Sequence, residues 1–302
     1  MKMFETMPIK LENELLQIEI QKPGNPYRES RFDWTGQIIQ ITYLNKHTFC
    51  TTELIKGQRI NECGRGLYNE FGLDEPIGYK DCRIGNTFPK IGVGLLTKDS
   101  DDKYDFSKPY KIDPYSFPYS TEKTKSQFFC ETEKGQDYSF QLDKKIELNE
   151  SKFTIFYNLY NCGKKTIDTN EYVHNFLSIN NRLIDEGYKL TFPFQLHPEK
   201  FGYVVDPENV FNFQNDSLTW NTVPSTPFFI SKVNSDYDGK GSWMLVNLKD
   251  RIGIQEMSDF NVQKINLWGN SHVVSPELYI KIVVPPGKKI SWSRTYSVFS
   301  LK

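Results

Sequence analysis

Short segments in which apolar and polar residues alternate recur along most of this chain, separated by clusters of Gly, Pro, Asn and Asp. Alternation with a period of two puts every second side chain on one face of a β-strand, whereas an amphipathic helix needs a period near 3.6. Stripes with the helical period are scarce. The chain is also 15% aromatic, and aromatic side chains favour the half-buried surface of strands. The pattern predicts an all-β protein.

The spacing of these segments favours stacked antiparallel sheets. Turn signals such as Asn161-Cys162-Gly163-Lys164 and Pro285-Pro286-Gly287-Lys288 join neighbouring segments. Without a linker or an internal repeat, we predict one large antiparallel β-sandwich domain over residues 1–302. Residues 58–90 and Asp99–Ser120 are predicted to be long loops. The clearest predicted strands are Leu15–Gln21, Gln37–Tyr43, Gln127–Thr132, Tyr138–Leu148, Lys152–Asn161, Asn170–Ile179, Ser242–Asn247, Gly253–Met257, Leu278–Val284 and Lys289–Phe299.

The charge balance excludes several classes of partner. Lys and Arg number 37 against 38 acidic residues, so electrostatics favours neither nucleic acid nor an anionic membrane as a partner. No segment approaches the ~20 apolar residues of a membrane span, and the N-terminal residues lack a signal-peptide core. We expect a soluble cytoplasmic protein, in a reducing compartment because its cysteines are odd in number and widely spaced. They are Cys50, Cys63, Cys82, Cys130 and Cys162.

Local motifs point to neither a metal nor a cofactor. The four histidines are His47, His174, His197 and His272, and none belongs to an HxH, HxxxH or HExxH pattern. No phosphate-binding loop and no GxSxG elbow occurs. Chemistry must therefore come from side chains brought together by the fold.

Two residues are the best candidates for acid–base chemistry. His174, in Glu171–Phe176, shares a predicted strand face with Tyr172, and its near-neutral pKa suits proton transfer in both directions. Glu277, in Ser275–Tyr279, is the candidate base. The alternatives are a core histidine satisfied by one hydrogen bond and a solvent-facing glutamate beside Lys281.

The chain resembles the aldose 1-epimerase or galactose mutarotase-like family. EYVHNFLSIN (171–180) resembles the family strand that carries the catalytic acid histidine, and YKLTFP (188–193) resembles a stretch that follows it in divergent members. VVSPELYIKIVVPPGKKISWSRTYSVF (273–299) resembles the closing strands, where a glutamate precedes a Pro-Gly turn. YRESRFDWTGQIIQITY (27–43), NEFGLDEPIGY (69–79) and FPKIGVGLL (88–96) resemble a distinct subgroup. The resemblance implies a supersandwich fold, with His174 as acid and Glu277 as base.

The chain departs from the family pattern at other positions. A family histidine in a His-Gly loop corresponds here to Glu70, so a carboxylate replaces an imidazole. Arg31, Arg65 and Lys90 are candidates for contacts with hydroxyls or with an anionic substituent, or else form structural ion pairs. We expect Trp268 to stack on the sugar. The hydroxyl-binding aspartate of the family has two candidates, Asp206 and Asp216.

The resemblance implies an isomerase that interconverts the α and β anomers of an aldose without a cofactor. We expect His174 and Glu277 to face one cleft with a sugar-sized gap between them. The substrate is then a small-molecule sugar, free, acidic or phosphorylated, and the protein a monomer or homodimer. The main alternative is a non-catalytic carbohydrate-binding protein on the same fold. An accessory sandwich that assembles with other subunits is a second alternative, and a glycosidase is disfavoured because no second carboxylate stands out.

Overall fold

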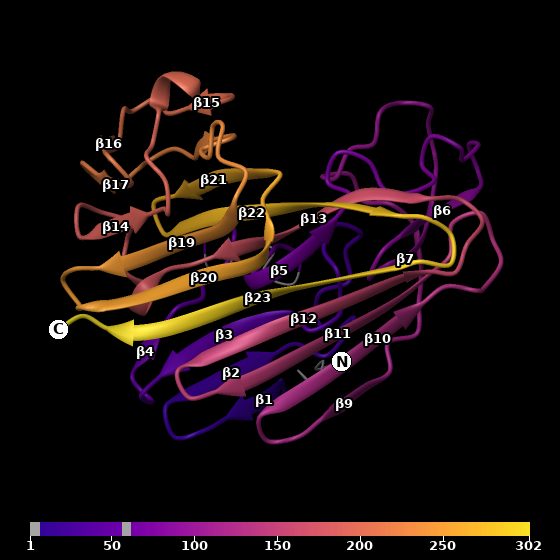
Figure 1. Cartoon of the computed structure of the whole chain (residues 1–302), viewed down its shortest axis with the longest axis horizontal. Helices are drawn as coiled ribbons and strands as arrows, with labels where there is room; N and C mark the ends of the chain where they lie inside the picture. The colour runs from indigo at the N-terminus through magenta and orange to yellow at the C-terminus, as the bar shows by residue number, and fades with distance from the viewer. Residues whose placement is uncertain (1–6, 56–61) are drawn as a thin grey trace.

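Two ten-stranded sheets make up most of the structure, a computed structural model that describes residues 7–55 and 62–302. The first sheet carries both halves of the candidate acid–base pair, on its adjacent central strands β13 and β22 (Figure 1). Its order is β1 (Ile9–Glu12), β2 (Leu16–Ile20), β3 (Ile38–Tyr43), β5 (Gly66–Phe71), β13 (Ile167–Phe176), β22 (Val273–Val284), β21 (Lys264–Asn270), β18 (Phe228–Ile230) and β15 (Val204–Val205), with β4 (His47–Thr48) beside β3.

The second sheet contains the long strands labelled β11, β12, β20 and β23 in Figure 1. Its order is β16 (Phe211–Gln214), β17 (Ser217–Trp220), β14 (Tyr188–Thr191), β19 (Lys240–Asn247), β20 (Ile252–Asn261), β23 (Lys289–Ser300), β12 (Lys152–Asn161), β11 (Phe140–Asn149), β10 (Lys125–Glu131) and β9 (Tyr119–Thr121). A small sheet contains β6 (Thr87–Lys90), β7 (Gly94–Thr97) and β8 (Ile112–Pro114), and two short 3-10 helices are η1 (Ile179–Asn181) and η2 (Pro198–Lys200).

The main core lies between the two large sheets. Ile18 and Ile41 from the first sheet belong to the same buried cluster as Leu142 and Ile155 from the second. The pairings between strands are antiparallel, and β11 and β12 show strict alternation between buried and less buried residues. These observations confirm the predicted all-β antiparallel sandwich. The two sheets stack because each must cover the apolar face of the other.

The other face of the first sheet is also covered. A second buried cluster joins Tyr68 and Phe176 of this sheet to Phe32, Phe88 and Tyr104, which come from the connections and from the small sheet. Their rings meet edge to face, for example Phe32 with Phe176 at 6.0 Å between centroids. This covering places the candidate site under side chains rather than on an open sheet.

Strand β5 overturns part of the loop prediction. Residues 58–90 were expected to form a loop, but Gly66–Phe71 is a fully buried central strand and Thr87–Lys90 is β6; 58–61 lie outside the described residues. Because β5 is covered on both faces, it shows no alternation of polarity. Gly66 has φ +62°, and a Cβ there would lie 2.2 Å from the Ile38 carbonyl oxygen, so only glycine admits β5 beside β3. The predicted loop Asp99–Ser120 likewise contains β8.

The ten strands predicted from alternation all occur, with ends shifted by a few residues. The largest differences are β20, which extends to Asn261, and β22, which begins at Val273 rather than Leu278. In the described ranges, no helix is long and apolar enough to cross a bilayer.

Candidate active site

His174 and Glu277 lie opposite each other on adjacent strands. Strands β13 and β22 pair with Glu171 opposite Ile280, and the same register continued along both strands places His174 opposite Glu277. Residues that face each other on one side of an antiparallel pair have Cβ atoms close enough for direct contact. Accordingly, Nε2 of His174 lies 3.3 Å from Oε1 of Glu277.

Two further residues of β22 hold this pair. Because side chains alternate along a strand, Ser275 and Tyr279 share the face of Glu277. The Ser275 hydroxyl lies 2.7 Å from Nδ1 of His174 and 3.4 Å from Oε1 of Glu277. The Tyr279 hydroxyl donates to Oε2 of Glu277 at 3.1 Å. Both ring nitrogens of His174 and both oxygens of Glu277 therefore have fixed partners.

The pair is buried among aromatic rings. The side chain of His174 is 5% exposed and that of Glu277 is 4% exposed. Phe176 stacks on the His174 ring at 3.9 Å, and Trp268 meets it edge-on at 5.2 Å between centroids. The expected sugar-sized gap between the pair is thus absent, because opposite positions on paired strands are in direct contact. The stacking of Trp268 on a sugar stays a prediction.

Burial sets the protonation of the pair. Loss of solvation raises the pKa of Glu277 to about 8, against which the charge of Arg31 and the hydrogen bond from Tyr279 act. Loss of solvation, together with the charge of Arg31, holds the pKa of His174 well below its ordinary value. At neutral pH Glu277 is therefore protonated, His174 is a neutral imidazole, and the pair carries no net charge.

Glu70 lies at the centre of a second polar cluster on the same sheet face. On β5 it is fully buried opposite Tyr172, whose hydroxyl donates to its Oε2 at 2.7 Å. Nε of Arg31 donates to the same oxygen at 2.9 Å, and the Arg31 guanidinium also reaches Glu53 at 3.2 Å. Nζ of Lys90 lies 3.5 Å from Oε1 of Glu70. Two carboxylates thus neutralise two cations beside the acid–base pair.

The basic candidates separate into two groups. Arg31 and Lys90 share Glu70, and burial lowers the pKa of Lys90 to about 8, while the Glu70 charge opposes that shift. Arg65 is half-buried and forms an isolated backbone bridge with Thr52. Within the described part of the chain, Arg65 makes no hydrogen bond or ion pair with any of the other candidate site residues.

A cavity of about 200 Å³ adjoins the Glu70 cluster through Arg31. The Arg31 guanidinium lies between the rings of Phe32 and Phe106, at 4.4 and 4.5 Å from their centroids, and all three residues line the cavity. Neither His174 nor Glu277 lines it. Arg31 therefore stands between the solvent-facing cavity and the Glu70 cluster.

Only some of the other residues around the acid–base pair and the Glu70 cluster could have been predicted from the sequence. Ser275 and Tyr279 alternate with Glu277, so their common face was predictable from the period of two. Glu53 lies in a connection with no periodicity, and no sequence signal marks it. Asp206 caps the backbone N–H of Val210, and Asp216 lies in the turn between β16 and β17. In the described residues, no group of three or more His, Cys, Asp or Glu is arranged to hold a metal ion.

Solved structures of other proteins share this architecture. The Slr1438 protein from Synechocystis sp. PCC 6803 is similar at TM-score 0.59 and 12% identity over 100% of both chains. A galactose mutarotase related enzyme from Lactobacillus acidophilus is similar at TM-score 0.59 and 10% identity over 98% of both chains. A provisionally named aldose 1-epimerase from Escherichia coli K12 has TM-score 0.59 and 10% identity, over 98% of this chain and 99% of its own.

Comparison of sequences, unlike comparison of structures, finds no similar protein. No protein-family profile matches the chain, and no curated protein matches it. Identities of 10 to 12% over nearly complete chains mean that the strand arrangement is shared while most side chains differ. The chain therefore has the galactose mutarotase-like fold, as the sequence resemblance predicted.

Proposed function

We propose that this protein is an aldose 1-epimerase-type isomerase that interconverts the α and β anomers of an aldose. The observation that carries the proposal is the pair His174–Glu277, held at 3.3 Å on adjacent strands with one transferable proton between them. A general acid and a general base in one site are the groups that this reaction needs. No cofactor takes part in the proposed reaction.

Ring opening moves two protons and breaks one bond. Glu277 accepts the proton of the anomeric hydroxyl, His174 donates a proton to the ring oxygen, and the bond between C1 and the ring oxygen breaks to leave an aldehyde. Rotation about C1–C2 and ring closure on the other face of the carbonyl, with the roles reversed, give the other anomer. Both oxygens are bonded to C1, so the two proton transfers take place within one small part of the sugar.

The resting pair must first change its proton distribution. Burial leaves the proton on Glu277, whereas ring opening needs a carboxylate and an imidazolium. Proton transfer across the 3.3 Å contact converts one form into the other without any change in net charge. The bound sugar, whose hydroxyls hydrogen-bond to charged groups, favours the ionised form.

The surrounding residues support a polyol as the ligand. In the proposal, Glu70, Arg31 and Lys90 orient the hydroxyls, Trp268 packs against the sugar ring, and Arg65 serves a more distant contact. Because the charges of Arg31 and Lys90 are already balanced by Glu70 and Glu53, the cluster favours a neutral sugar over a phosphorylated one.

The test is anomer exchange, measured by polarimetry or by NMR on a panel of free and phosphorylated aldoses. His174→Ala and Glu277→Gln should each lower the exchange rate by about 10² to 10⁴-fold. Lys281→Gln is the matched control, because this exposed residue lies on the same face of β22 and pairs with Asp168 at the surface. Full activity in either site variant, on a sugar that the parent turns over, contradicts the proposal.

A sugar-binding protein without catalysis is the second candidate. The cavity beside Arg31 favours it, since this space is bounded by Phe32 and Phe106 and does not reach the acid–base pair. Saturation-transfer NMR separates the two functions. Binding of an aldose with exchange no faster than the spontaneous rate selects this alternative.

A further inference from the structure

We propose that Asn175 and Arg294 are positioning residues that hold Glu277 against His174 from the rear face of the sheet. The inference rests on the proposed function for its kinetic consequence and on the structure alone for its geometry. Neither residue lies on the site face. Asn175 follows His174 on β13 and points into the space between the large sheets, and Arg294 reaches the same space from β23.

The regular hydrogen-bond ladder between β13 and β22 stops beside the pair. It runs to Glu171 opposite Ile280, and an isolated bridge, Leu177 with Val274, lies beyond. Pro276 has no N–H to donate, which accounts for a break next to Glu277. The strands therefore need other bonds to fix their separation at this point.

Asn175 supplies those bonds. Its Nδ2 donates to the Pro276 carbonyl at 2.6 Å, and its backbone N–H donates to the Ser275 hydroxyl at 2.9 Å. That hydroxyl is the group that contacts Nδ1 of His174. A single residue on β13 thus fixes the carbonyl that precedes Glu277 and the hydroxyl that orients His174.

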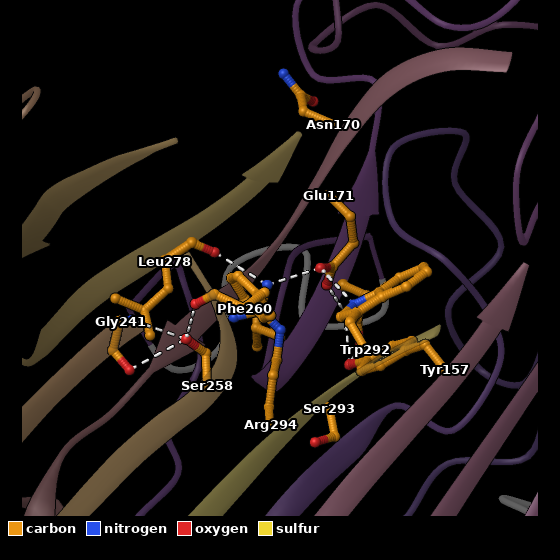
Figure 2. Close-up of polar contacts among 12 residues, drawn as sticks. Tyr157, Asn170, Glu171, Gly241, Ser258, Phe260, Leu278, Trp292, Ser293 and Arg294 are labelled. Carbon is orange, nitrogen blue, oxygen red and sulfur yellow. Dashed lines mark hydrogen bonds and ion pairs between the residues drawn. The ribbon is translucent and has the colours of Figure 1, made fainter. Parts of the chain in front are cut away.

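Arg294 holds the other side of Glu277. Its Nη2 donates to the Leu278 carbonyl at 3.0 Å and lies 2.6 Å from Oε2 of Glu171, as Figure 2 shows. The carbonyls of the residues before and after Glu277, Pro276 and Leu278, are therefore both bound from the core, one by Asn175 and one by Arg294. This clamp restricts the backbone of β22 on both sides of the catalytic carboxyl.

The two positioning residues are joined by a shared carboxylate. Nη1 of Arg294 lies 2.7 Å from Oε1 of Glu256, and Oε2 of Glu256 accepts from Asn175 at 3.1 Å. The Tyr296 hydroxyl donates to Oδ1 of Asn175 at 3.0 Å. All of these side chains are fully buried, so each bond is strong and each loss leaves an unpaired group.

The network is connected with the proposed catalysis because its hydrogen bonds end on the residues next to Glu277. Buried charges are often replaceable by apolar residues without loss of stability, so stability alone does not account for an ionic network. A network that ends on the carbonyls of Pro276 and Leu278, the residues on either side of Glu277, instead fixes the position of Glu277. A displacement of reacting groups near 1 Å costs about 10²-fold in rate, which sets the scale of what the clamp protects.

Two buried tyrosines make a matched pair for the test. Tyr296 stacks on Phe153 at 4.9 Å between ring centroids and donates to Asn175, whereas the hydroxyl of the fully buried Tyr188 on β14 bonds to the backbone N–H and carbonyl of Ile179. Tyr296→Phe should lower kcat about tenfold with KM unchanged, and Asn175→Ala about 10- to 100-fold. Tyr188→Phe removes a buried hydroxyl that shares no partner with the clamp and should keep kcat within about twofold of the parent.

A second readout does not depend on turnover. The ¹⁵N resonances and the titration of the His174 ring, followed by NMR, should shift in Tyr296→Phe and Asn175→Ala but not in Tyr188→Phe. If the parent shows no anomer exchange, the proposed function fails while this comparison still decides the inference. Equal effects of Tyr296→Phe and Tyr188→Phe on the His174 resonances overturn it.

Discussion

Replacing Glu277 with glutamine should make the folded protein more stable while lowering its anomer-exchange rate by about 10² to 10⁴-fold. The Glu277 carboxyl is buried and its pKa is raised to about 8, against about 4.3 in an unfolded chain. Between these values the unfolded chain releases a proton that the folded chain keeps. The contribution of Glu277 to stability therefore falls as pH rises through this window. Glutamine has nearly the same shape and lacks this ionisation.

The size of the effect follows from the pKa difference. At pH 7 the proton held on Glu277 disfavours the folded state by about 3 to 4 kcal/mol, and at pH 5 by about 1 kcal/mol. The advantage of Glu277→Gln should thus grow by about 1.4 kcal/mol per pH unit and level off above pH 8. Active sites commonly contain groups that are needed for activity but lower the stability of the folded protein.

Urea unfolding of the parent and of Glu277→Gln at several values of pH measures this difference. Glu122→Gln, an exposed change, is the control and should show no pH-dependent difference from the parent. A difference that stays constant between pH 5 and pH 8 refutes the reasoning, because it means that Glu277 does not change the number of protons released on unfolding in this range.

Two further predictions concern the cations beside the pair. Arg31→Gln removes a positive charge that lowers the pKa of both Glu277 and His174, so the pH profile of anomer exchange should move to higher pH. Arg28→Gln, at an exposed position, is the control and should leave the profile unchanged. An unchanged profile in Arg31→Gln contradicts the electrostatic role. The pKa of Lys90 is lowered to about 8 from an ordinary value of about 10.4. Between these two values of pH, Lys90 is protonated in the unfolded chain and neutral in the folded chain. Its contribution to the free energy of unfolding should therefore rise by about 3 kcal/mol from pH 8 to about pH 10.4. Unfolding of Lys90→Met should lack that rise, and a parallel rise in both proteins would show that Lys90 is not its source.

The period-two pattern was sufficient to predict the strands that have one face in the core. Strands β11 and β12 alternate along their whole length, and their predicted ends lie within a few residues of the observed ones. Strand β5 was predicted to be a loop, because burial on both faces removes the alternation. Its Glu70 was nevertheless a candidate residue, through the family resemblance.

Arg294 shows a signal that sequence reading can use. It alternates with Trp292, Tyr296 and Val298 on the inward face of β23, where a charged residue needs a buried partner. The pattern can flag such a residue, but its partners Glu171 and Glu256 lie on other strands, far away in the sequence.

The sequence by itself determined the all-β class and the shared faces of His174 with Tyr172 and of Glu277 with Tyr279, since these depend on local periodicity. The family resemblance marked His174 and Glu277 as the candidate pair. Only the tertiary structure decided that His174 and Glu277 are in direct contact and that the resting proton lies on Glu277. The physical reason is that strand register and burial arise from pairings between distant segments, and both the distance and the pKa shifts depend on them.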